Sequence, residues 1–179
     1  PVDPSASGVA ETIADWAEHP GTVAIRIMLS QTASTDGNDP GIANVLSAAA
    51  RHGLPVNLSC KGRLAQVGQL AARNAETQLV VDHLGLEQPH HPPVPQNPFA
   101  ELPKLLNLAQ YDNVAVKVTG ACTLSHAPFP YDDLWDPLAR VFDAFGLDRC
   151  MWGTDWTRAM EIINYAQGVE PFRMTDRLS

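Results

Sequence analysis

The segment Gln78-Leu79-Val80-Val81-Asp82-His83 is an apolar run that ends in an aspartate and a histidine. Its branched apolar side chains are typical of a strand that is covered on both faces. A helical pattern precedes it at residues 64–74, and another follows after a loop at residues 99–110. A strand between two helices of this length predicts a βαβ unit, and therefore a parallel sheet.

The same alternation continues on both sides of this segment. Further strands are predicted at residues 22–29, 55–60, 114–118 and 149–153, and further helices at residues 9–19, 42–52 and 131–145. The proline-rich segment 84–98 is too short for a linker and is interpreted as a functional loop or a lid. The chain is therefore expected to be a single α/β domain over residues 1–179. A doubly wound open sheet is the rival arrangement, and it is disfavoured because no glycine-rich phosphate loop follows any predicted strand.

The composition narrows the function classes. The chain has 179 residues, a net charge of −8 and no basic stripe, which argues against binding nucleic acid or an anionic membrane. An anionic small molecule is still compatible, because a few local arginines or lysines can hold it. The three cysteines form no CxxC pair, and neither a secretory signal nor a membrane-spanning apolar run is present. A cytoplasmic location is the expectation.

Ionisable residues fall where the predicted strands end. His83 closes one strand, Asp155 follows the last, and Arg26 and Lys117 lie within two others. Ligands of parallel α/β folds bind at the carboxyl ends of the strands, so these four side chains are candidates for one site. Structural alternatives stay open: Asp155 as the N-cap of the next helix, Arg26 and Lys117 as partners of interior carboxylates, and His83 as a solvent-facing residue.

Four stretches together resemble the amidohydrolase-2 family of the amidohydrolase superfamily. They correspond to the family's sixth, eighth, seventh and fourth strands: Val80-Val81-Asp82-His83-Leu84-Gly85, Met151-Trp152-Gly153-Thr154-Asp155-Trp156, Val116-Lys117-Val118-Thr119-Gly120, and Ala24-Ile25-Arg26 with Leu29. Their order and spacing match, and the likeness covers most of the chain. It is nearest to the branch of 2-pyrone-4,6-dicarboxylate hydrolases and sugar lactonases.

The resemblance implies a (β/α)8 TIM barrel, of which strands four to eight are present. The family's first-strand His-x-His pair is absent, because no two histidines here are separated by one residue. The chain is thus expected to begin after the third barrel strand, to end before the last helix, and to be inactive when isolated. Without that pair, one divalent metal (Zn or Mn) held by Asp155 and His83 and a metal-independent site both stay open.

The resemblance also implies roles. Asp155 would be the general base that activates water, and His83 would polarise the substrate carbonyl. Arg26, Lys117 and Arg63 would hold a substrate carboxylate. The predicted function is hydrolysis of a cyclic ester or related carbonyl compound in an enzyme that is compatible with a homo-oligomer. The alternatives are metal-dependent non-oxidative decarboxylation of an aromatic or muconate-type acid, and a non-catalytic fragment or interaction domain.

Overall fold

The five strands form one parallel sheet in which each strand pairs with the next along the chain. The structure, a computed structural model, describes residues 1–178. The strand order is β1-β2-β3-β4-β5 and every pairing is parallel. The strands are β1 (Ile25–Ile27), β2 (Val56–Leu58), β3 (Leu79–Val81), β4 (Val114–Thr119) and β5 (Cys150–Gly153). This confirms the predicted α/β class, and a strand is present in each of the five predicted strand ranges.

The helices that precede β5 lie where the sequence pattern predicts them: α1 (Val9–Glu18), α2 (Pro40–Arg51), α3 (Leu64–Arg73), α4 (Leu102–Leu106) and α5 (Trp135–Phe145). Two more, α6 (Trp156–Ala159) and α7 (Tyr165–Met174), follow β5. The helix α2 begins two residues before the predicted start at Ile42, because Asp39 accepts a hydrogen bond from the Ile42 N–H at 3.0 Å and Pro40 occupies the first turn. The predicted helix 99–110 is shorter, since α4 continues as a 3-10 turn, Asn107–Gln110.

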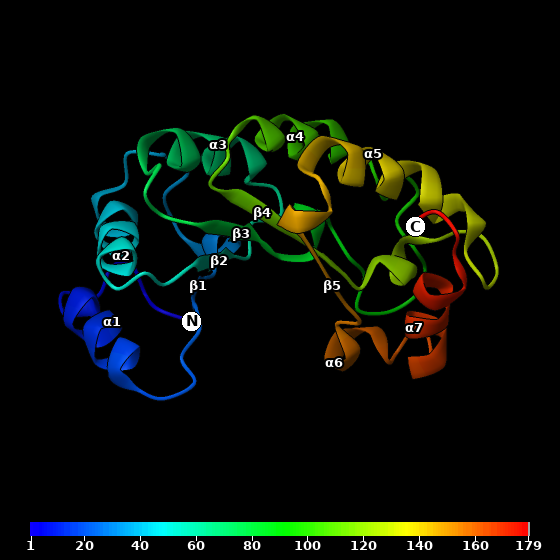
Figure 1. Ribbon diagram of the computed structural model, residues 1–179, viewed down its shortest axis with the longest axis horizontal. Coiled ribbons are helices and arrows are strands. Elements are labelled where there is room, and N and C mark those ends of the chain that lie inside the picture. The colour runs from blue at the N-terminus through cyan, green and yellow to red at the C-terminus, as the bar shows by residue number, and fades with distance from the viewer. Residues whose placement is uncertain (179) are drawn as a thin grey trace.

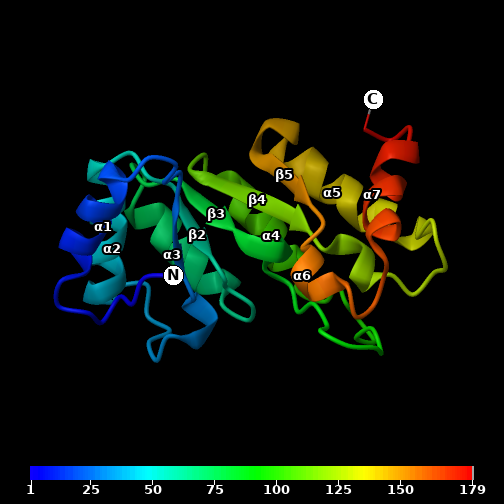
Figure 2. The ribbon, with the colours of Figure 1, turned by 90° about the horizontal axis from the view of Figure 1, so that it is seen from below.

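The sheet is curved, and the helices that connect its strands follow its convex side. Figure 1 shows α3, α4 and α5 one after another along the outside of the arc, and Figure 2, seen from below, shows the strands in front of them. In β1 and β2 the outer residues of each strand are buried, whereas the central residues, Arg26 and Asn57, are only half-buried. The convex face therefore forms the apolar core, and the concave face presents the polar side chains of Arg26 and Asn57 beside the buried Val80 and Ala115.

This arrangement is part of a (β/α)8 barrel. Consecutive parallel strands with their crossover helices on one side are the repeating unit of that fold, whereas a doubly wound sheet carries helices on both faces. A parallel bridge between Val2 and Ile27, with the Val2 N–H donating to the Arg26 carbonyl at 2.8 Å, extends the sheet beyond β1. The sequence pattern predicts no strand at that position. Across residues 1–178, no helix is long and apolar enough to cross a membrane; a cytoplasmic location stays a prediction.

The open edge at β5 leads to a prediction about association. Met151 is 40% exposed and Trp152 48% exposed, so this edge presents apolar side chains beside unpaired backbone groups. Residues 1–179 are expected to associate in solution at micromolar concentrations, as measured by sedimentation velocity. The variant Met151→Lys places a charge on the edge and should reduce the association. A wild-type monomer that unfolds in urea in one cooperative step would show that the edge is tolerated.

Candidate active site

The concave face holds a cavity of about 240 Å³ at the carboxyl ends of the strands. Its lining residues come from all five strands or the residues that follow them: Arg26, Asn57, Asp82, His83, Lys117, Thr119 and Asp155. Four of these are sequence-predicted site residues, and parallel packing of strands separated by long helices brings them together. The structure therefore places the predicted histidine, aspartate and two cations in one cavity.

A buried carboxylate at the end of β3 organises the two cations. The Asp82 side chain is 2% exposed, with Oδ2 lying 2.8 Å from Arg26 Nε and Oδ1 lying 3.0 Å from Lys117 Nζ. The two cations are less buried: 39% of the Arg26 side chain and 29% of the Lys117 side chain are exposed. One carboxylate is shared by two cations, so the cluster retains one positive charge that faces the cavity. An ionised carboxylate at this depth requires such pairing.

The imidazole of His83 lies between this cluster and Asp155. Its Nδ1 is 2.7 Å from Thr119 Oγ1 and 3.5 Å from Asp155 Oδ2, and its Nε2 is 3.5 Å from Arg26 Nη2. Burial lowers the pKa of His83 below 6.5, an effect that Asp155 and Asp82 oppose and that Arg26 adds to. Burial disfavours the charged imidazolium, so the ring is mainly neutral at pH 7.

Asp155 occupies the N-cap position of α6, but its side chain makes no capping hydrogen bond. Its Oδ2 instead accepts a 2.5 Å hydrogen bond from Arg158 Nε and lies near His83. The Asp155 side chain is 15% exposed. The helix-cap alternative therefore does not account for this carboxylate, which is directed into the site.

Both predicted catalytic residues have unusual backbone conformations. His83 has φ of 54° and Asp155 has φ of 51°, and Leu84 follows His83 with φ of 60°. Left-handed conformations are disfavoured for residues with a Cβ, most of all for bulky ones such as Leu84, and they concentrate at functional sites. The two strand ends turn sharply at the residues whose side chains enter the cavity.

Arg63 stands apart from the cavity. Its guanidinium donates hydrogen bonds to the carbonyls of Ser34 at 3.1 Å and Thr32 at 3.2 Å, and it is not among the lining residues. In this structure it ties the 30–34 loop to the start of α3. Its predicted role in substrate binding stays a prediction.

Several residues of the site are not predicted from the sequence. Asp82, Asn57 and Thr119 line the cavity, and Arg158 contacts Asp155 from behind it. Asp82 had a signal, because a carboxylate that ends a buried strand needs a cation nearby. Thr119 and Asn57 had none, since short polar residues are common near strand ends.

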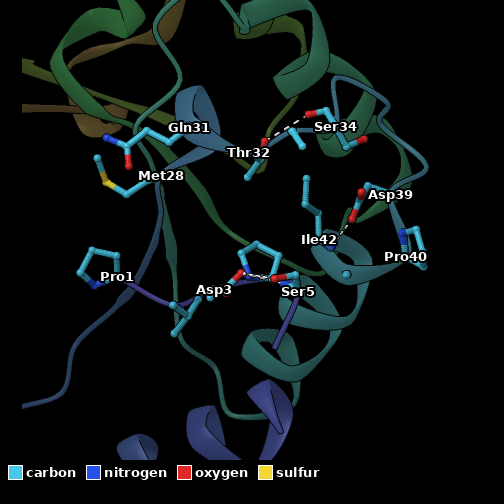
Figure 3. A pocket seen from close by; sticks show the side chains of 14 residues that line it. Pro1, Asp3, Ser5, Met28, Gln31, Thr32, Ser34, Asp39, Pro40 and Ile42 are labelled. Atoms are coloured by element: carbon cyan, nitrogen blue, oxygen red, sulfur yellow. Dashed lines mark hydrogen bonds between the residues drawn. The ribbon is translucent and has the colours of Figure 1, made fainter. Parts of the chain in front are cut away.

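A larger cavity of about 790 Å³ lies elsewhere, between the first residues and the start of α2. Figure 3 shows its wall, with Asp3, Thr32 and Asp39 among the labelled side chains. Asp3 accepts hydrogen bonds from the Ser5 N–H and hydroxyl, and Asp39 caps α2, so both carboxylates have local structural partners. None of the residues that line the smaller cavity lines this one, and it offers no comparable chemistry.

A metal ion at Asp155 and His83 would have two protein ligands. Zinc sites in proteins use three or four, and nowhere in residues 1–178 does a group of three His, Cys, Asp or Glu residues come close enough to hold a metal. Asp155 Oδ2 already bonds Arg158, and His83 Nδ1 bonds Thr119. The described residues do not form a metal site by themselves, and a metal in the complete protein stays a prediction.

Comparison with known proteins gives this arrangement a family. The family model described as amidohydrolase matches residues 1–177. The chain belongs to the amidohydrolase family. The region that matches the family model includes the five strands β1 to β5 and all of the residues that line the smaller cavity.

Individual relatives agree with this family. The amidohydrolase is 41% identical over 83 residues to 4-sulfomuconolactone hydrolase from Rhizobium radiobacter, a match that covers 46% of this chain and 26% of the relative. A zinc-bound amidohydrolase from Burkholderia multivorans shares the fold, with a TM-score of 0.77, 23% identity and coverage of 97% of this chain and 63% of the other. A Pseudomonas putida protein assigned as a 2-pyrone-4,6-dicarboxylic acid hydrolase also shares the fold. Its TM-score is 0.69 and its identity 23%, and the match covers 97% of this chain and 62% of the other. The chain therefore spans less than two thirds of these relatives' lengths.

The buried cluster predicts a measurable stability cost for Asp82→Asn. The change leaves Arg26 and Lys117 without their carboxylate. Loss of one partner of a fully buried pair costs about 3–5 kcal/mol, and because both cations are partly exposed we expect about 2 kcal/mol. Urea unfolding would measure this as a lower midpoint.

The matched control for that variant is Glu87→Gln. Glu87 pairs with Lys61 at 2.7 Å, but both side chains are largely exposed. An exposed pair contributes about 0–1 kcal/mol, so this change should be near neutral. Equal costs for the two variants would contradict the view that burial makes the Asp82 cluster important.

The lowered pKa of His83 predicts a pH dependence of stability. The folded state has a pKa below 6.5 and the unfolded state one near 6.5, so the unfolded state binds the proton first as pH falls. The stability that neutral His83 contributes is therefore present at pH 8 and is lost as pH falls from about 6.5 through the folded pKa. An NMR titration should place the His83 midpoint below 6.5, and His83→Gln should weaken the loss of stability on acidification. A midpoint above 6.5 would contradict this.

Proposed function

We propose that this amidohydrolase hydrolyses a cyclic ester that carries a negatively charged group, with Asp155 as the general base and His83 as the electrophile. The observation that carries the proposal is the pairing of Asp155 Oδ2 and His83 Nδ1, 3.5 Å apart in one cavity. A carboxylate within reach of a water molecule can take its proton, and a neighbouring donor can stabilise the carbonyl oxygen as it gains charge. Water adds to the carbonyl carbon, the ring C–O bond breaks, and the product is a hydroxy acid.

The environment of His83 suits an electrophile that remains neutral. Arginine can only donate, so the Arg26 Nη2 that lies 3.5 Å from His83 Nε2 requires this nitrogen to accept, and the proton of the neutral ring then lies on Nδ1, 2.7 Å from Thr119 Oγ1. For His83 to act as the electrophile, this Nδ1–H would donate to the substrate carbonyl, as neutral histidines donate in other barrel enzymes. Burial of the ring, which keeps its pKa low, supports this assignment.

The charge of the cavity supports an anionic substrate. Arg26 and Lys117 share the single carboxylate of Asp82, and both cations are partly exposed toward the cavity. Arginine recognises planar anions through paired N–H groups, and lysine adds a point charge. A carboxylate or sulfonate on the lactone ring would satisfy the remaining positive charge. The similarity to a 4-sulfomuconolactone hydrolase makes 4-sulfomuconolactone the first probe.

The proposal is tested by supplying the full-length protein with 4-sulfomuconolactone and with five- and six-membered lactones that carry or lack a ring carboxylate. The protein should convert the anionic lactones into hydroxy acids. Asp155→Asn keeps the shape of the side chain and removes the base, so kcat should fall by about a hundredfold to ten-thousandfold with little change in KM. His83→Asn should lower kcat by about a hundredfold or more. Stopped assays of hydroxy-acid formation, normalised to folded protein, would measure both.

Arg26→Met is the matched variant for substrate binding. It should raise KM for anionic lactones and leave KM for neutral lactones nearly unchanged, because only the anion loses its cation. An Asp155→Asn enzyme with normal turnover would eliminate the mechanism. Release of CO2 instead of a hydroxy acid would support the decarboxylase alternative. A full-length protein that hydrolyses none of these lactones would contradict the proposed function.

A further inference from the structure

We propose that Arg158 is a positioning residue of this site, which holds the Asp155 carboxylate in place and joins the loops that follow β3, β4 and β5. This inference rests on the proposed role of Asp155 as the base. Arg158 does not line the cavity, so it is not expected to contact the substrate. It acts through the carboxylate that it holds.

The guanidinium of Arg158 is buried, with only 11% of the side chain exposed, and its donors meet four acceptors. Nε donates to Asp155 Oδ2 at 2.5 Å, and Nη2 donates to Gln88 Oε1 at 2.5 Å. Nη1 donates to the Pro89 carbonyl at 2.6 Å and to Thr123 Oγ1 at 3.1 Å. The rigid planar fork of arginine can satisfy such a set, whereas a lysine ammonium cannot reach all of it.

Gln88 extends this network to the other catalytic residue. Its side-chain amide is buried, and while Oε1 accepts from Arg158, Nε2 donates to the Thr119 carbonyl at 2.8 Å and to the His83 carbonyl at 3.4 Å. Thr119 in turn bonds His83 through its hydroxyl. Arg158 is therefore connected to Asp155 directly and to His83 through one intervening side chain.

A glycine leaves the space that the guanidinium fills. Gly120 has φ of 67°, and a Cβ placed on it would lie 2.1 Å from Arg158 Nη2, 2.6 Å from Gln88 Oε1 and 3.2 Å from Asp155 Cβ. Any side chain at this position would displace the guanidinium or the glutamine. The absence of a side chain at Gly120, after β4, therefore makes room for Arg158, which follows β5.

Arg149 shows what a purely structural arginine looks like in the same molecule. It precedes β5, at the opposite end of the strand, and its donors all meet backbone carbonyls, those of Phe145, Tyr111, Val114 and Ala109. Arg158 has a comparable number of hydrogen bonds, but one of its acceptors is the carboxylate proposed as the base. This contrast supplies a matched control.

The test uses the full-length protein, with crystal structures of the wild type and Arg158→Met and kinetics on the anionic lactone that the wild type hydrolyses fastest. Asp155 Oδ2 should leave its place 3.5 Å from His83 Nδ1. Misplacement of a reacting group by about 1 Å can cost a hundredfold, so kcat should fall about ten- to hundredfold while KM stays within about twofold. Arg158→Lys, which retains one donor to Asp155, should recover part of the loss and is the fallback if Arg158→Met does not fold.

A double variant separates positioning from general stability. If Arg158 acts through Asp155, Arg158→Met should cause no further loss of kcat in an Asp155→Asn background. Arg149→Met should lower the urea midpoint and leave kcat per folded molecule unchanged.

The positioning role is overturned if Arg158→Met leaves the Asp155 carboxylate in place, if its kcat equals that of wild type, or if the losses in the double variant multiply. If the wild type hydrolyses no lactone, the proposed function fails, and the crystal structures alone then decide whether Arg158 holds Asp155.

Discussion

The carboxylate of Asp82 is the group on which the concave face depends. Arg26 comes from β1 and Lys117 from β4, and without a shared anion their heads would repel each other across the interior of the sheet. Asp82 follows β3, between them, and its depth in the protein strengthens both attractions because solvent screens them little. The cations are thereby fixed on the concave face of the sheet with one positive charge in excess.

The strand ends that carry the chemistry are held in conformations that the backbone alone would avoid. His83, Leu84 and Asp155 all have positive φ, each at a cost of about 1–3 kcal/mol. Burial of Leu84 and the ion pair of Asp155 with Arg158 supply compensating contacts. The strain and its compensation therefore lie at the same positions, which couples the geometry of the site to the packing just behind it.

Much of the fold and part of the site follow from the sequence. Apolar runs between amphipathic helices predict the strands, and parallel pairing then requires Arg26, His83, Lys117 and Asp155 to gather at one end. The paired part of β1 is shorter than the predicted strand 22–29, because pairing depends on neighbours that the local pattern does not contain. Arg158 could not be predicted either, since its partners Gln88 and Thr123 lie 70 and 35 residues away along the chain.

The consecutive strand order also separates the two halves of the centre along the chain. Each strand pairs with the one before it. Asp82 and its two cations all lie between β1 and the end of β4. Asp155 and Arg158 both follow β5. The charges that would hold an anion therefore belong to the first four strands and the residues between them, whereas the group that would activate water lies on the segment after the fifth, so loss of that one segment would remove the base and its arginine together.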